Sequence, residues 1–223
     1  MPSHPPTDLP APPIEGLRDR NKALRRAAIL DATRELLRAA PGQEPTRRAI
    51  AERAGVAPAT VYNLVGDRAQ IWQALADALL ADLEQNLSAR PASNPLTRVR
   101  QIVDMTVQMF IDDPAVSTRV LQRWEQSGLV LRRGPIGALA QALAEAQEQA
   151  LLGGQIDARS LAWNIGTSCV GAVHQWAAGQ LDAPQLRVRV RLAAELTMAA
   201  VAEEPVRARL TGGLRRRLRA LDR

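Results

Sequence analysis

The N-terminal third of the chain carries hydroxyl and guanidinium side chains of the types that contact the phosphates of a nucleic acid. Such groups bind phosphate oxygens and position a protein on a duplex without reading its sequence. Within one short stretch these side chains are Thr46, Arg47, Thr60, Tyr62 and Arg68. Five more basic residues lie upstream, at Arg18, Arg20, Lys22, Arg25 and Arg26. We expect phosphate contacts from this set, with Lys22 and Arg26 as the upstream contributors.

Four residues within the same stretch are suited to reading base edges. A guanidinium pairs with guanine and a carboxamide with adenine, which predicts these roles for Arg48 and Asn63. Pro58 and Ala59 offer apolar surface to the methyl group of thymine. The stretch therefore combines residues that would fix position with residues that would read sequence.

Charge is distributed unevenly along the chain, whose net charge is +6. Residues 18–68 hold eleven basic and six acidic side chains, and residues 205–223 hold seven arginines against Asp222 alone. Residues 69–204 hold eleven basic and fourteen acidic side chains. Contact with a polyanion is therefore expected to be local rather than general.

An amphipathic helix over 22–40 is predicted to precede the contact residues. Apolar side chains recur there at three- and four-residue steps, and Pro41 and Gly42 end the pattern. The residues expected to face inward are Leu24, Ala28, Ile29, Ala32, Leu36 and Leu37.

Two short helices are predicted to hold the contact residues themselves. Thr46 is a suitable N-cap for a helix over 47–54, and Gly55 supplies a tight turn. A brief helix over 58–64 follows, and a long helix over 68–89 comes next. This is a helix-turn-helix arrangement, whose second short helix can enter the major groove.

Residues 29–72 resemble the N-terminal DNA-binding domain of the TetR (tetracycline repressor) family of transcriptional regulators. The matching positions are Ile29, Ala32, Leu36, Leu37, Thr46, Ile50, Ala51, Ala54, Gly55, Val56, Thr60, Val61 and Tyr62. The departures are Ala57 for the usual serine cap, Leu64 for His or Tyr, Val65 for Phe, Arg68 for Lys, and a shorter loop over 42–46. Arg68 keeps the charge that holds a phosphate, whereas Leu64 cannot bind one.

The rest of the chain is also predicted to be helical, so the fold class is all-α. Helices are expected over 97–111, 115–127, 135–152, 158–179 and 184–202, with a basic final helix after Pro205 that Gly212-Gly213 interrupts. Arg187, Arg191 and Glu195 share one face of the helix over 184–202, and Arg189 points into its apolar arc and needs a partner.

The chain is expected to divide into four parts. A Pro-rich disordered leader over 1–17 precedes a DNA-binding domain over 18–66. An effector-binding and dimerisation domain over 67–204 begins with a connecting helix over 67–90, and a basic tail over 205–223 follows it.

The resemblance implies a homodimer in which residues 158–202 form a four-helix interface. Small residues that would let helices approach closely support it: Gly166, Gly171, Ala172, Ala177 and Ala178. A dimer places two recognition helices about one turn of DNA apart, roughly 34–36 Å, which predicts a palindromic operator. The uncharged stretch over 160–181 is long enough to cross a bilayer, but its polar residues favour a helix buried within protein.

A ligand-responsive regulator also needs a cavity for a small apolar effector. Met, aromatic and aliphatic residues on the predicted helices are candidates for its lining, namely Met105, Met109, Phe110, Val120, Trp124, Leu139, Leu143, Trp163 and Thr167.

The sequence also excludes several classes of site. One cysteine, Cys169, allows no intrachain disulfide, and with His4 and His174 it is too little for a zinc cluster. Carboxylate metal sites are not excluded by this count, but no acidic cluster has the spacing of a cation-binding loop. No catalytic residue, metal or cofactor is predicted, and the cytoplasm is the expected compartment. The function expected is a dimeric transcriptional repressor released from DNA by its effector.

Two alternatives belong to other classes of protein. In the first, the chain is a helical small-molecule-binding or enzymatic protein whose helix-turn-helix serves only as scaffold. In the second, the basic tail and the uncharged helix bind a membrane surface. Salt-dependent binding to promoter DNA distinguishes the first from a regulator, and flotation with liposomes tests the second.

Overall fold

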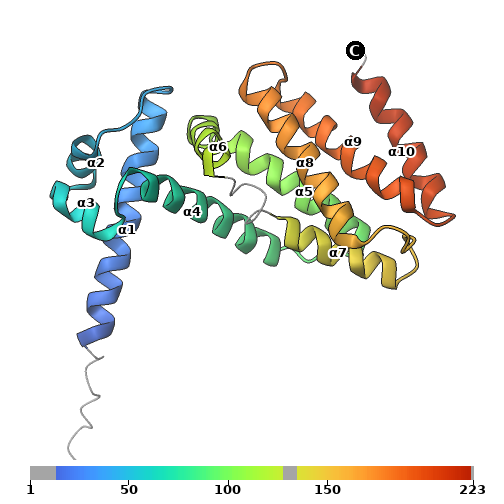
Figure 1. Ribbon diagram of the computed structural model, residues 1–223, viewed down its shortest axis with the longest axis horizontal. Helices are drawn as coiled ribbons and strands as arrows, with labels where there is room; N and C mark the ends of the chain where they lie inside the picture. The colour runs from blue at the N-terminus through green and yellow to red at the C-terminus, as the bar shows by residue number, and fades with distance from the viewer. Residues whose placement is uncertain (1–13, 128–134, 222–223) are drawn as a thin grey trace, which may run out of the picture. The chain divides into compact units, whose positions relative to one another are not determined.

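The computed structural model describes residues 14–127 and 135–221, with side chains described over 16–123 and 135–213 (Figure 1). Its helices are α1 (Ile14–Ala39), α2 (Arg47–Ala54), α3 (Pro58–Leu64), α4 (Arg68–Ser88), α5 (Pro95–Asp112), α6 (Pro114–Ser127), α7 (Ile136–Glu148), α8 (Ala158–Ala177), α9 (Ala183–Val201) and α10 (Val206–Leu221). Over the described residues no β-sheet forms, and Leu152 and Ala202 make an isolated bridge. The predicted all-α fold is confirmed.

The chain divides into two compact units, residues 1–74 and 75–223. The division falls inside α4 and not at residue 66, where the sequence analysis ends the first domain. Ile71 and Trp72 explain the difference, because both are buried and the Trp72 indole donates a hydrogen bond to Glu44 in the loop before α2. The first turns of α4 thus belong with the helices that precede them.

In the first unit α1, α2 and α3 pack against one another. Ile29 and Leu37 of α1, Ile50 of α2 and Val61 of α3 are buried and form the shared core. Ile29 and Leu37 are among the residues that the helical spacing predicted to face inward on α1.

The start of α1 differs from the prediction. The helix begins at Ile14 and not at residue 22, so residues 14–17 are helical. Residues 16–25 are exposed. Of the residues expected in the core, Leu24 is 61% exposed and Ala28 is also exposed, so both expectations were wrong. Arginine, lysine and leucine are strong helix formers, which explains a helix that extends past its packed part (Figure 1). Residues 1–13 lie outside the described part of the chain.

In the second unit α5 is central and packs against α6, α7, α8 and α9. α8 lies between α7 and α9, and α10 packs along α9 (Figure 1). The core is mainly aliphatic, with Ile102, Leu143, Ile165, Leu186 and Met198 fully buried.

Three polar pairs run along the contact between α5 and α9. They are Arg100 with Glu195 at 3.2 Å, Asp104 with Arg191 at 2.5 Å, and Gln108 with Arg187 at 2.6 Å. Positions on each helix are four residues apart, so each helix contributes a single face, and the two helices pair in opposite directions. The predicted common face of the three α9 residues is confirmed.

The predicted inward position of Arg189 was wrong. Its side chain is exposed and does not enter the apolar arc. The neighbouring Val190 is buried instead. The buried face of α9 is therefore narrower than the apolar face of its helical wheel, and Arg189 lies outside it.

Two other boundaries also differ. α7 ends at Glu148 rather than at residue 152, because Ala150 takes a positive φ of 53° and the amides of Leu151 and Leu152 both donate to the Ala146 carbonyl. α10 runs without interruption through Gly212-Gly213. The side chains of α10 after residue 213 lie outside the described side chains.

The small residues of α8 do not all face outward. Gly166 is buried, and a Cβ atom there would lie 2.9 Å from Ile136 Cδ1, so the close approach at this glycine is to α7 of the same chain. Ala172 is also buried, whereas Gly171 and Ala178 are exposed. Over the described residues, none of the helices is both long enough and apolar enough to span a bilayer.

Candidate nucleic-acid interface

The turn between α2 and α3 is fixed by local hydrogen bonds. Thr46 caps α2 by accepting a hydrogen bond from the Ala49 amide at 3.2 Å, as predicted. At the other end Gly55 takes a left-handed φ of 66°, which a side chain disfavours, and the Val56 amide donates to the Ala51 carbonyl at 3.0 Å. These bonds set the direction in which α3 leaves the turn.

α3 presents a polar face to solvent. Val61 is fully buried and anchors the helix, while Tyr62 is 55% exposed and Asn63 is exposed. Pro58 and Ala59 in its first turn are also exposed, and Thr60 is half-buried. All the α3 residues predicted to contact DNA except Thr60 therefore lie on the exposed face. Ala57 caps α3 without a side-chain hydrogen bond.

The N-terminus of α2 contacts this face. The Arg47 guanidinium lies over the Tyr62 ring, 5.3 Å from its centroid. A cation over an aromatic face is attracted by the ring quadrupole. The contact orients two predicted phosphate-binding groups together.

Arg48 has a partner on its own helix. Its Nε lies 2.9 Å from Glu52 Oε1, and both side chains are exposed. The hydrogen bond that Arg48 donates to Glu52, and then the negative charge of Glu52, raise the pKa of Arg48. Solvent screens an exposed pair of this kind, so a guanine edge can compete for the guanidinium.

Arg68 is held by a residue that the sequence analysis did not single out. The Glu44 carboxylate, with only 18% of its side chain exposed, accepts bonds from both the Arg68 guanidinium and the Trp72 indole, the latter at 3.1 Å. Arg68 and Trp72 lie one turn apart at the start of α4, which is the spacing that lets them share one acceptor. That spacing is the signal in the sequence that could have identified Glu44.

The remaining interface candidates lie on α1 and at the end of α3. Lys22 is exposed and Arg26 is half-buried. Leu64, which replaces a polar family residue, is half-buried and packs at the end of α3 rather than reaching into solvent.

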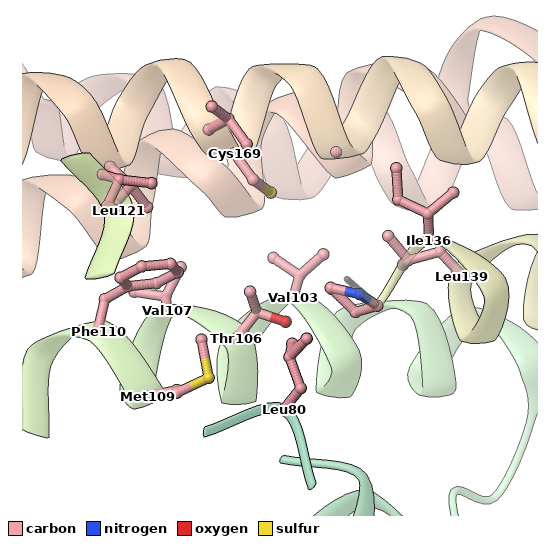
Figure 2. A pocket seen from close by; sticks show the side chains of 14 residues that line it. Leu80, Val103, Thr106, Val107, Met109, Phe110, Leu121, Ile136, Leu139 and Cys169 are labelled. Atoms are coloured by element: carbon pink, nitrogen blue, oxygen red, sulfur yellow. The ribbon is translucent and has the colours of Figure 1, made fainter. Parts of the chain in front are cut away.

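The second unit contains a cavity of about 50 Å³ bordered by α4, α5, α6, α7 and α8 (Figure 2). Of the predicted lining residues, Met109, Phe110 and Leu139 border it. Val120 and Leu143 are instead buried in the core, Met105 packs against the core, Trp163 is half-buried, and Thr167 is exposed. The side chain of Trp124 lies outside the described side chains.

The residues that the sequence analysis missed come from several helices at once. They are Leu80, Val103, Thr106, Val107, Leu121, Pro135, Ile136, Gly166, Cys169, Val170 and Val173. Periodicity shows which face of one helix is buried, but only the packing of several helices shows where they leave a gap.

The described lining of the cavity is almost wholly apolar, and none of the described lining residues is charged. The Thr106 hydroxyl donates to the Ile102 carbonyl of its own helix at 2.7 Å. Burial raises the pKa of the Cys169 thiol to about 12, so it stays protonated at neutral pH. Over the described residues, no three acidic, histidine or cysteine side chains gather as metal ligands.

No family model matches the sequence, and no curated protein matches it either. Solved structures do match. One, from Rhodococcus sp. and assigned to the TetR family of transcriptional regulators, has a TM-score of 0.61 at 20% identity and covers 78% of this chain and 98% of its own. SmeT, the repressor of the Stenotrophomonas maltophilia multidrug efflux pump SmeDEF, has a TM-score of 0.61 at 21% identity, with 81% and 92% covered.

A TetR transcriptional regulator from Rhodococcus sp. RHA1 matches with a TM-score of 0.57 at 17% identity, covering 82% of this chain and 100% of its own. The identities are low, so the likeness lies in the arrangement of helices. It extends over nearly the full length of each matched structure. The chain therefore has the fold of the TetR-family transcriptional regulators.

Proposed function

We propose that this chain is a TetR-family transcriptional repressor, a homodimer that binds a palindromic operator and is released from it by a small apolar effector. The observation that carries the proposal is the exposed face of α3. Residues of the types that read bases, Pro58, Ala59 and Asn63, lie there beside Tyr62, and a buried Val61 holds the helix in place.

On DNA the residues would divide into two groups. Thr46, Arg47, Tyr62 and Arg68 would contact phosphates and fix the register, with Lys22 and Arg26 extending that contact from α1. Arg48 and Asn63 would read base edges.

Dimerisation is supported by an uncharged face on α8. Its exposed residues recur at three- and four-residue steps and are Ser160, Asn164, Thr167, Gly171 and Gln175. Leu196 on the neighbouring α9 is 52% exposed, and the Asn164 amide donates to the Thr197 hydroxyl at 2.8 Å, which ties the two helices together. An exposed leucine beside small uncharged residues is the composition of a surface that a second copy would cover.

Light scattering with Leu196→Glu tests this face. The unaltered chain should have the mass of a dimer at micromolar concentration, and the variant should have that of a monomer with its helical content intact. Ile156→Glu, which alters an exposed residue in the turn before α8 and not on the proposed face, is the matched control and should remain a dimer. A 24.2 kDa species for the unaltered chain would contradict the proposal.

The effector would bind in the cavity bordered by Val103, Phe110 and Cys169. Its described lining favours a neutral apolar molecule over a charged one, because none of the described lining side chains would compensate a buried charge. Ligand pockets usually exceed about 300 Å³, so an effector would widen this cavity and stabilise a conformer in which the two recognition helices no longer match the operator. SmeT, which shares the fold, is the repressor of a multidrug efflux pump.

Selection of bound fragments from genomic DNA tests the function as a whole. It should return a palindromic sequence, and binding to that sequence should weaken steeply with salt. Arg68→Ala should lower the salt slope by about one charge per subunit, while Arg90→Ala, at an exposed arginine of the second unit, should leave it unchanged. Failure to enrich any sequence would contradict a sequence-specific regulator.

A further inference from the structure

A groove separate from the apolar cavity lies between the start of α5, the end of α7 and α10. Its volume is about 310 Å³, which is within the range of small-molecule sites. Leu96, Leu151 and Leu210 supply apolar wall, and Asn94, Arg100 and Arg209 supply polar groups. None of the residues that line it is a candidate for DNA contact or for the effector cavity.

Backbone hydrogen bonds join two turns beside the groove. The Gly153 amide donates to the Val201 carbonyl at 2.6 Å, and the Glu203 amide donates to the Leu151 carbonyl at 3.2 Å. Arg207 adds a hydrogen bond to the Ala202 carbonyl at 2.6 Å. The turn before α8 and the turn before α10 are therefore fixed side by side, which places Leu151 against the first turns of α10.

Two of the polar groups of the groove, Arg100 and Arg209, are positive. Arg100 is half-buried, and its Nε donates to the nearly buried Glu195 at 3.2 Å. Burial, and then the nearby Arg191, lower the pKa of Arg100. Arg209 is exposed and makes no ion pair within the described part of the chain, and among the described lining residues none is acidic.

The backbone adds to the same potential. Asn94 caps α5 by accepting from the Thr97 amide at 2.9 Å, so the positive end of an 18-residue helix also faces the groove. Its carboxamide nitrogen remains a donor. A ligand with an anionic head and an aliphatic body would satisfy both the arginines and the leucine walls.

We propose that this groove is a binding site for a small amphiphilic anion, with the head between Arg100 and Arg209 and the aliphatic body along Leu96, Leu151 and Leu210. The site is distinct from the effector cavity, whose lining residues, as far as the structure describes them, carry no charge. Its occupancy would join α5, α7 and α10, which are far apart in the sequence.

Calorimetric titration of the full chain without DNA tests the site. The probes are decanoate and decyl phosphate, with decanol as the uncharged match of equal chain length, all below their micelle-forming concentrations. Both anions should bind, and decanol should bind at least about tenfold more weakly, which is the effect of losing one charge-assisted contact. Binding of decyl phosphate without decanoate would identify a phosphate head, and the converse a carboxylate.

Substitutions of the exposed Arg209 test whether the anions bind in the groove. Arg209→Glu should weaken decanoate binding by at least about tenfold, and Arg209→Lys should restore most of it. Arg189→Glu changes the charge of another exposed arginine outside the groove and is the matched control, with no expected effect. Equal affinity for decanol and decanoate, or equal loss in the Arg189 and Arg209 variants, would overturn the proposal. So would the absence of binding by either anion.

Discussion

The face of α3 and the apolar cavity of the second unit place their candidate functional residues in opposite environments. Tyr62 is 55% exposed and its neighbour Asn63 is exposed, whereas Val103, Val107 and Leu139 of the cavity are each 1% exposed. On α3 a buried residue holds the helix and other residues are free to make contacts. In the cavity the same side chains hold the core and would contact the ligand.

This difference determines how each region can be altered. A side chain on the α3 face can be removed with little change to the packing of the fold, because the contacts it offers are external. Removal of a cavity side chain changes packing and ligand site together. The two regions should therefore respond differently to substitution, and four measurements test that expectation from the largest effect to the smallest.

The largest expected effect concerns the reactivity of Cys169. Burial raises the pKa of its thiol from 9.0 to about 12. Since each pKa unit is a tenfold change in thiolate, alkylation by iodoacetamide at pH 8 should be about a thousandfold slower in the folded chain than in denaturant. Gln85→Cys in a Cys169→Ala background supplies an exposed thiol that should react quickly in both states. Rapid labelling of native Cys169 would show that the cavity region opens to solvent.

The second prediction concerns stability. Leu139→Ala should lower the free energy of unfolding by about 2–5 kcal/mol, because it removes a buried side chain and enlarges a cavity. Tyr62→Ala should cost less than about 1 kcal/mol, since it loses only an exposed contact with Arg47. Urea unfolding measures both, with Ile156→Ala as an exposed aliphatic control in the same unit as Leu139. Similar losses for Leu139 and Tyr62 would remove the distinction between the regions.

The third prediction separates base reading from phosphate contact within the first unit. Arg48→Ala and Asn63→Ala should each cost about 1–3 kcal/mol per half-site and relax the preference at one operator position. Arg68→Ala should weaken binding to all sequences alike. Competition binding against single-base operator variants measures this. An unaltered preference in the Arg48 and Asn63 variants, with a changed one for Arg68, would reverse the assignment.

The smallest expected effect concerns Glu44, whose carboxylate competes with phosphate for Arg68. Glu44→Gln removes the charge but keeps an amide oxygen that can accept from the Trp72 indole. DNA affinity should rise by up to about 1 kcal/mol, because the largely exposed Arg68 guanidinium would no longer have to leave a carboxylate to reach a phosphate. Glu84→Gln, at an exposed acid of the second unit, is the control for net charge and should have a smaller effect. Unchanged affinity in Glu44→Gln would show that Arg68 does not reach a phosphate.

The local parts of this protein follow from the sequence alone. Thr46, Gly55 and Pro58 define the ends of α2 and α3 through capping, a positive φ and a helix start, all of which depend on near neighbours. Three- and four-residue spacing identified part of the inward face of α1, including Ile29 and Leu37, and the same spacing placed Arg187, Arg191 and Glu195 together on α9. The resemblance on residues 29–72 predicted the fold that the solved structures share.

The tertiary structure decided which side chains from distant helices meet. Glu44 reaches Arg68 and Trp72 across a loop, Gly166 packs on Ile136, and the cavity takes lining from five helices. These contacts depend on how helices cross one another, and a periodic pattern carries no information about crossing or depth. Local hydrogen bonding and periodicity depend on residues that are close in the sequence. A cavity or groove exists only where several packed helices leave unfilled space.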